Sequence, residues 1–223
     1  MKIATLGIAL ILTLALASQS ALAQQPEIDE HPFEVGGQFT FVGLGSLESN
    51  ITIFGSTIPF TQFDQTYGGI GGRIGYNFNR YFAIEAEGNF LPRRNFSEVE
   101  RSRKAQFLAG VKAGVREETF GIFAKARPGI MYFSALPGHS SCIFSLPLSV
   151  NCVEQSQTNF AFDAGGVFEY YPTPRTAIRI DAGDTIVRFK EAGPTALLLG
   201  SSIFTPASTT HSFQMSFGIT YRF

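Results

Sequence analysis

The chain has 223 residues and a nearly balanced charge, with 17 Lys and Arg residues against 18 Asp and Glu residues. This balance gives no basic surface for nucleic acid, so we expect no nucleic-acid partner. Phe and Gly each occur 23 times, and Trp is absent. The length fits one domain of ordinary size.

The first residues have the pattern of a secretory signal peptide. Met1-Lys2 is followed by an apolar run to Ala17 and then by small residues up to Ala23. A positive start, a short apolar stretch and small residues are typical of a cleaved signal, and the run is short for a transmembrane helix. We therefore predict a signal peptide over 1–23, a short periplasmic segment over 24–32 and one barrel domain over 33–223.

After this start, apolar and polar residues alternate in nearly every segment, which predicts β-strands with two different faces. In chain order the alternating segments are 33–41, 70–78, 82–90, 106–116, 120–127, 160–170, 178–189 and 212–223. The last is the clearest, because every odd position from Phe213 to Phe223 is apolar and every even position is polar or glycine. These segments predict an all-β fold, an eight-stranded antiparallel up-and-down barrel.

The seventh segment departs from the alternation midway. Asp184 and Arg188 fall on the apolar parity, whereas Val187 and Phe189 fall on the polar one. A β-bulge adds one residue to a strand and so shifts its register. We therefore predict a bulge near Gly183-Asp184 that returns both charges to the polar face.

The connections and the aromatic residues indicate which face points outward. Short turns near 79–80, 117–118 and 172–175 alternate with long connections over 44–66, 91–104, 134–157 and 191–210. Aromatic residues of the apolar face gather at the strand ends, with Ala and Val between them. Both features are typical of outer-membrane barrels. We therefore predict a transmembrane barrel whose apolar face contacts outer-membrane lipid, with periplasmic turns and extracellular loops. A soluble ligand-carrying barrel, which reverses the faces, is the alternative.

The polar face carries charges of both signs. The interior of such a barrel is just wide enough for its side chains to fill it, and an uncompensated charge there costs roughly 3–5 kcal/mol. We therefore predict ion pairs inside the barrel, formed by Arg73, Glu85, Glu87, Lys112, Lys125, Arg127, Asp163, Arg179 and Asp181.

Two cysteines, Cys142 and Cys152, lie in the third long connection. An exported protein meets an oxidising compartment, so we predict a disulfide between them. A metal site is the weaker alternative, because His139 is the one obvious further ligand and structural zinc takes four. We predict no metal and no cofactor.

His211-Ser212 invites comparison with a catalytic dyad. Neighbouring strand residues point to opposite faces, so the two side chains cannot act together in a regular strand. No acid is evident in the sequence to orient the histidine. We therefore predict that the protein is not an enzyme.

The chain resembles the small outer-membrane β-barrel family that includes the transmembrane domain of outer membrane protein A and the opacity-type surface antigens. The resemblance rests on the closing strand with its terminal Tyr221-Arg222-Phe223, and on the strand–turn–strand from Gly71 to Glu87. It implies that Tyr221 and Phe223 belong to the signal read by the barrel-assembly machinery. Because the sequence stops at Phe223, wall anchoring by a following domain is not carried over.

Two functions are compatible with a barrel in the outer membrane. The first is a structural or surface-interaction (adhesin-like) role, in which ion pairs plug the interior and the long loops contact an extracellular ligand. The second is a narrow pore for small solutes. We expect a monomer in either case.

Overall fold

The computed structural model describes residues 31–45, 47–53, 56–62, 65–92, 103–135, 140–145, 149–154, 156–197 and 201–223. The predicted signal peptide and most of the predicted periplasmic segment lie outside these residues. Within the described part, no helix is long and apolar enough to cross a bilayer.

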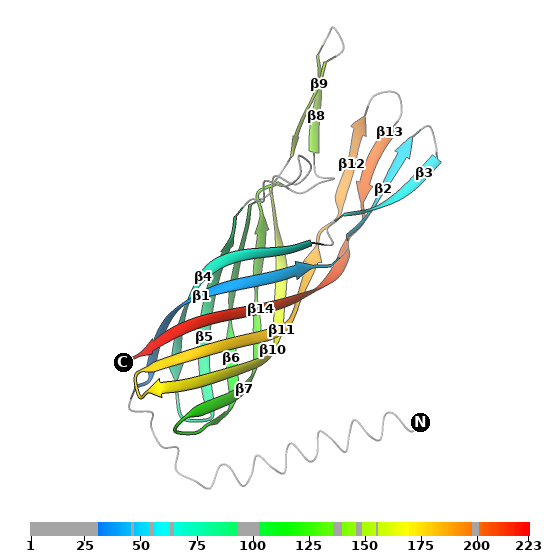
Figure 1. Cartoon of the computed structure of the whole chain (residues 1–223). Coiled ribbons are helices and arrows are strands. Elements are labelled where there is room, and N and C mark those ends of the chain that lie inside the picture. Colours follow the sequence, from blue (N-terminus) through cyan, green and yellow to red (C-terminus); the bar gives the residue numbers. More distant parts are fainter. Residues whose placement is uncertain are drawn as a thin grey trace, which may run out of the picture.

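Eight antiparallel strands close into a barrel, in the spatial order β1-β14-β11-β10-β7-β6-β5-β4 (Figure 1). The first strand pairs with the last, and Glu34 lies opposite Arg222. Closure follows from the environment, because lipid cannot satisfy the hydrogen bonds of a free strand edge. The predicted fold is therefore confirmed. The barrel strands are β1 (Phe33–Leu44), β4 (Gln65–Asn77), β5 (Phe82–Leu91), β6 (Lys104–Arg116), β7 (Phe120–Phe133), β10 (Gln157–Thr173), β11 (Thr176–Phe189) and β14 (Ser208–Arg222).

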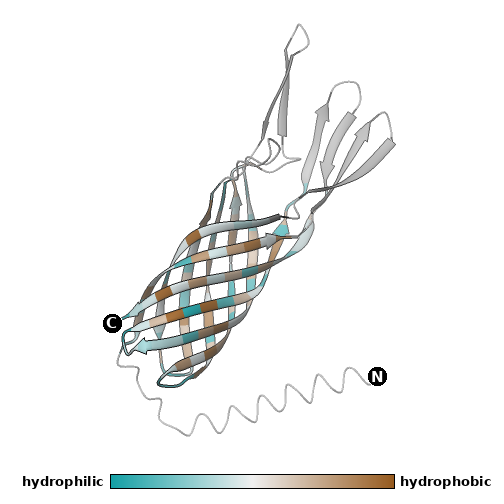
Figure 2. Cartoon of the chain, viewed as in Figure 1, coloured by the Kyte–Doolittle hydropathy of each residue, from teal (hydrophilic) through white to brown (hydrophobic). Residues whose placement is uncertain are grey.

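The apolar face of these strands points outward. Large apolar side chains such as Phe39, at 64% exposed, and Ile74, at 62%, lie on the outer surface. Arg73, between Gly72 and Ile74 on β4, is 4% exposed and faces the interior. Figure 2 shows the resulting alternation of hydrophobic and hydrophilic residues along each barrel strand. This arrangement suits a wall that faces lipid and excludes the soluble alternative, whose apolar face is inside.

The predicted bulge in β11 is wrong. Gly183 and Asp184 pair without a register shift with Gly165 and Ala164 of β10, and with Gln214 and Phe213 of β14. The inside–outside alternation therefore continues to the end of β11, and Asp184 stays on the outer face. The prediction failed because it assumed that every inward residue is polar, whereas Val187 and Phe189 point inward.

Short turns join the strands at the end of the barrel where the C-terminus lies (Figure 1). In the β4–β5 turn, the Asn79 side-chain oxygen accepts hydrogen bonds from the backbone N–H groups of Tyr81 and Phe82, at 2.8 and 2.9 Å. An asparagine that caps its own turn in this way fixes a tight connection between neighbouring strands. These are the predicted periplasmic turns.

The long connections at the opposite end contain strands that the sequence did not predict. β2 (Leu47–Ile53), β3 (Ser56–Gln62), β12 (Ala192–Leu197) and β13 (Ser201–Thr205) form a sheet in the order β12-β13-β2-β3. β8 (Ser140–Ser145) and β9 (Ser149–Glu154) form a separate hairpin. Figure 1 shows both groups beyond the loop end of the barrel. The extracellular side is therefore built partly of sheet.

Candidate functional site: the barrel interior

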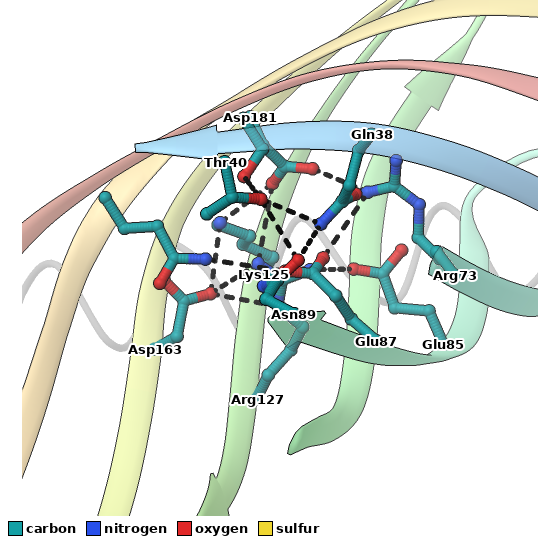
Figure 3. A network of polar contacts seen from close by, with 12 residues as sticks. Gln38, Thr40, Arg73, Glu85, Glu87, Asn89, Lys125, Arg127, Asp163 and Asp181 are labelled. Atoms are coloured by element: carbon teal, nitrogen blue, oxygen red, sulfur yellow. Dashed lines mark hydrogen bonds and ion pairs between the residues drawn. The ribbon is translucent and has the colours of Figure 1, made fainter. Parts of the chain in front are cut away.

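Arg127 lies at the centre of the interior and is fully buried. Its Nη1 is 2.6 Å from Glu87 Oε2 and 3.0 Å from Glu85 Oε1. Its Nη2 and Nε donate to Asp163 Oδ2, at 2.7 and 2.9 Å. The planar guanidinium can contact several carboxylates at once, which a compact ammonium group does less well. Arg127 thereby joins β5, β7 and β10 across the barrel (Figure 3).

Arg179 forms a second junction. Its Nη1 and Nη2 hold both oxygens of Glu85, at 2.7 and 2.9 Å, in a bidentate pair. Its Nε donates to Asp181 Oδ2 at 2.7 Å, and its Nη1 is 3.3 Å from Glu169 Oε1. Bidentate pairs of this type are the strongest and most directional ion pairs in proteins. Glu85 therefore links the Arg127 and Arg179 junctions into one network.

Three further cations complete the network. Lys112 Nζ is 2.6 Å from Glu169 Oε1. Lys125 Nζ bridges two aspartates, with Asp181 Oδ1 at 2.8 Å and Asp163 Oδ2 at 3.0 Å. Arg73 Nη1 is 2.7 Å from Asp181 Oδ2, which Arg179 also contacts. All nine side chains that the sequence assigned to interior ion pairs thus lie inside the barrel. Eight of them contact one another, and Lys112 joins them through Glu169, which also contacts Arg179.

A second cluster, nearer the periplasmic turns, was not among those predicted pairs. The Asn77 amide donates to Glu34 Oε1 at 2.7 Å, and Arg116 Nη2 donates to Asn77 Oδ1 at 2.8 Å. The Tyr171 hydroxyl donates to Glu169 Oε2 at 2.7 Å and accepts from Arg116 Nε at 3.0 Å. Tyr171 thus connects this cluster to the central network. The polar parity of Glu34 and Arg116 in the sequence places them inside, but it does not identify their partners.

Uncharged amides and hydroxyls lie on the loop side of the ion pairs. Asn89 Nδ2 donates to Glu87 Oε1 and to Gln106 Oε1, and its own oxygen accepts from Gln38 Nε2. Gln106 Nε2 in turn donates to Gln214 Oε1 at 2.9 Å. These side chains both donate and accept, so they extend the network without adding charge.

An apolar cluster lies beyond these amides, at the loop end of the interior. Its members occupy inward positions that the alternation predicts to be polar, so the sequence pattern does not reveal it. Its aromatic rings include Phe133 and Phe189, whose centroids are 5.4 Å apart. Lys104, 1% exposed, places its Nζ 3.5 Å from the centroid of the Tyr67 ring, a cation–π contact. We name this group the apolar layer; it consists of Val42, Leu44, Tyr67, Leu91, Leu108, Met131, Phe133, Ala161, Val187 and Phe189.

This architecture agrees with a family assignment. The outer membrane protein beta-barrel domain family matches residues 9–223. The chain belongs to this family. It is therefore an outer-membrane protein, as predicted from the alternation of short turns with long connections and from the aromatic residues at the strand ends. Among curated proteins, no sequence matches it.

Solved structures of other outer-membrane barrels share the fold. OprG from Pseudomonas aeruginosa is 13% identical at a TM-score of 0.51, with 88% of this chain and 99% of OprG covered. AlkL is 13% identical at a TM-score of 0.50, with 90% and 94% covered. The outer membrane protease OmpT from Escherichia coli is 8% identical at a TM-score of 0.43, with 90% and 99% covered.

On the outer face of this outer-membrane barrel, His211 has an acidic partner. Its Nδ1 is 2.6 Å from Asp184 Oδ2, and the backbone N–H of Ser212 donates to Asp184 Oδ1 at 3.1 Å. The expectation that no acid is placed near this histidine is therefore corrected. The predicted bulge, which places Asp184 in the interior, is inconsistent with this contact. The Ser212 side chain is buried inside the barrel, on the face opposite His211.

The two cysteines occupy opposite positions in the external hairpin. Cys142 of β8 and Cys152 of β9 are register partners. Their side chains lie outside the described residues, so the predicted disulfide stays a prediction. At the other end of the barrel, Tyr221 and Phe223 are exposed on the outer face, with their ring centroids 6.4 Å apart.

Proposed function

We propose that this protein is a closed barrel whose extracellular strands contact another surface, an adhesin-like role. The observation that carries the proposal is the filled interior. From Glu34 near the periplasmic turns to Phe189 near the loops, buried side chains contact one another across the barrel. Ion pairs occupy the centre, and the apolar layer occupies the extracellular end. The buried apolar side chains of this layer are expected to hinder the passage of water and ions.

The composition of the external strands indicates the kind of surface that they contact. Glu48 is the one charged residue in the sequences of β2, β3, β12 and β13, which are rich in Ser, Thr and Ile. A nearly uncharged sheet has little electrostatic attraction for polyanions or cations. We infer that it binds an uncharged, partly apolar surface of a protein or a lipid.

The two edges of the external sheet each carry a proline. Pro59 lies in β3 and Pro194 in β12, the two edge strands, whereas the inner strands β2 and β13 contain none. Proline has no backbone N–H and therefore hinders the addition of a further strand. Contact through a face of the sheet, with the protein as a monomer, fits this arrangement better than strand pairing between copies.

Conductance in a planar bilayer tests the closed interior. The wild-type protein, inserted with its heat-dependent gel shift intact, is expected to give no discrete openings. A Leu91→Ala, Phe189→Ala double variant thins the apolar layer and is expected to increase the frequency of openings. Discrete openings from the wild-type protein would instead support a narrow pore for small solutes.

Retention of bacteria on polystyrene tests the surface contact. A variant in which short turns replace 47–62 and 192–205 keeps the barrel and removes the external sheet. Cells that display the wild-type protein are expected to be retained severalfold better than cells that display this variant. Retention is expected to be the same at low and high salt, since uncharged contacts are not screened. Equal retention of both strains contradicts the proposed role.

We also propose that Cys142 and Cys152 form a disulfide that closes the external hairpin. Directly opposed residues of an antiparallel pair have Cα separations that a disulfide can span. A loop of this size contributes roughly 2–3 kcal/mol to the hairpin in the chain-entropy account. A thiol-reactive polymer is expected to modify the unfolded protein only after the protein has been reduced. Modification without a reductant would contradict the disulfide.

The C-terminal residues are proposed to direct assembly. Exposed aromatic side chains at Tyr221 and Phe223 are available to the barrel-assembly machinery before the barrel enters the membrane. Phe223→Ala keeps the two backbone hydrogen bonds between Phe33 and Phe223, and it is expected to lower the heat-shiftable fraction in outer membranes severalfold. Refolding of the same variant in detergent micelles, which bypasses the machinery, is expected to be unchanged.

A further inference from the structure

Three outward-facing glycines form a row across neighbouring strands of the barrel wall. Gly37 of β1 lies opposite Gly72 of β4, and Gly72 lies opposite Gly88 of β5. All three are exposed on the face that elsewhere carries Phe, Ile and Val. The row is therefore a gap in the apolar side chains that cover the wall.

The packing of the chain does not require glycine at these positions. A Cβ added at Gly37 or Gly88 meets no atom within 4 Å, and one added at Gly72 meets the Gly36 carbonyl oxygen at 3.7 Å. The inward-facing Gly110 differs, because a Cβ there collides with the Ala126 carbonyl oxygen of the next strand. Close approach of strands thus explains the inward glycine but not the outward row.

A groove of about 470 Å³ in the outer wall includes one member of this row, Gly88. Seven residues of β4, β5 and β6 line it. Ile70, Gly88, Phe90 and Ala105 belong to the outward parity, and Gly71, Asn89 and Gln106 belong to the inward parity. Gly88 leaves the space open, while Ile70 and Phe90 form apolar sides.

The position of the groove identifies its surroundings. β5 ends at Leu91 and β6 begins at Lys104, so the groove lies toward the loop end of the barrel, in the outer leaflet. It is continuous with the lipid-facing surface, since the neighbouring Phe107 and Phe39 are 54% and 64% exposed on the same face. Hydrocarbon chains therefore surround it.

We propose that this groove is a seat for an acyl chain of a phosphate-bearing lipid of the outer leaflet. In a bilayer, association depends on packing and not on the hydrophobic effect, because lipid tails are as apolar as the wall. A chain lying over Gly88 between Ile70 and Phe90 gains dispersion contacts on several sides, which a smooth wall does not offer. The headgroup class is inferred from Arg103, which is exposed directly before β6.

Native mass spectrometry of the protein extracted in mild detergent tests the site. The wild-type protein is expected to retain a phosphate-bearing lipid. The Gly88→Leu variant, whose side chain fills the groove, is expected to retain about tenfold less of this lipid, because its affinity for the acyl chain is lower. Gly166→Leu is the matched control, because Gly166 is also outward and open, with Phe123 O at 3.9 Å from an added Cβ, but lies on β10. Equal retention by all three proteins, or a dimer in place of bound lipid, overturns the proposal.

A second measurement uses the wild-type protein alone, so it does not depend on the folding of a variant. The barrel is placed in vesicles that contain a phosphate-bearing lipid with a photoreactive acyl chain. Light is expected to label the peptide 82–91 severalfold more than the peptide 160–170 on the other side of the barrel. The same acyl chain on a neutral headgroup is expected to show less of this preference. Even labelling of the two peptides contradicts the site.

Discussion

The centre and the loop end of the barrel interior have opposite chemistry. In the centre, Arg127 and Arg179 are surrounded by carboxylates, whereas the apolar layer places Phe133 and Phe189 in the same inward orientation. Strand geometry fixes which side chains face inward but not which chemistry they carry. The difference teaches that a small barrel interior can change from polar to apolar along its axis while the alternation of the strands stays regular.

The largest expected effect of a substitution is in the charged centre. Arg127→Met retains much of the side-chain length and leaves Glu87 and Asp163, both fully buried, without their main partner. Removal of one member of a buried ion pair costs about 3–5 kcal/mol. We expect a loss of this size in the free energy of unfolding, measured by urea titration of the protein in lipid vesicles.

Arg188→Met is the matched control for that experiment. Arg188 lies on the exposed outer face of β11, so the same substitution leaves no buried carboxylate unpaired. Its effect is expected to stay within about 0.5 kcal/mol, as for most surface substitutions. If the two variants were equally stable, the central ion pairs would not be the main source of the stability of the interior.

A reciprocal pair of substitutions on β11 locates the boundary between the two regions. Thr185 and Val187 are both fully buried and have similar shapes. Their surroundings differ, because Thr185 Oγ1 donates to Gln214 Oε1 at 2.8 Å, whereas Val187 belongs to the apolar layer. Thr185→Val leaves a buried acceptor with one donor fewer, and Val187→Thr buries a hydroxyl among apolar groups. Each is expected to lower the free energy of unfolding by about 1–3 kcal/mol.

The double variant that exchanges the two residues sharpens this test. If each position requires its own chemistry, the exchanged protein is less stable than either single variant in the same urea titration. If the interior were equally polar along its whole length, Val187→Thr would leave the free energy of unfolding unchanged. That result would remove the distinction between the apolar layer and the rest of the interior.

The sequence predicted the barrel because lipid imposes a strict pattern on it. Every outward position of a lipid-facing strand is under the same constraint, so segments such as 212–223 alternate without exception. The nine predicted ion-pair residues followed from parity together with charge. Which carboxylate each cation contacts depends on how strands far apart in sequence face one another across the barrel, and parity does not contain that information.

The errors have different physical origins. Val187 and Phe189 were assigned outward because inward residues were assumed to be polar, and this assignment required a bulge that β11 does not contain. The external strands were missed because 47–62 and 192–205 lack a lipid-facing side and so show no strict alternation. The glycine row was also missed, since it appears when β1, β4 and β5 are placed in register.

The smallest expected effect concerns Asp184 on the outer face. The side chains of Asp184 and His211 are 45% and 68% exposed toward the loop ends of β11 and β14, and an ion pair that water reaches contributes at most about 1 kcal/mol. Asp184→Asn keeps the shape and a hydrogen-bonding oxygen, so we expect less than about 1 kcal/mol of change in the free energy of unfolding. A loss of about 3 kcal/mol or more, of the size expected for a buried pair, would mean that the aspartate is buried. The bulge would then have to be reconsidered, and with it the inward position of Phe189 on which the apolar layer depends.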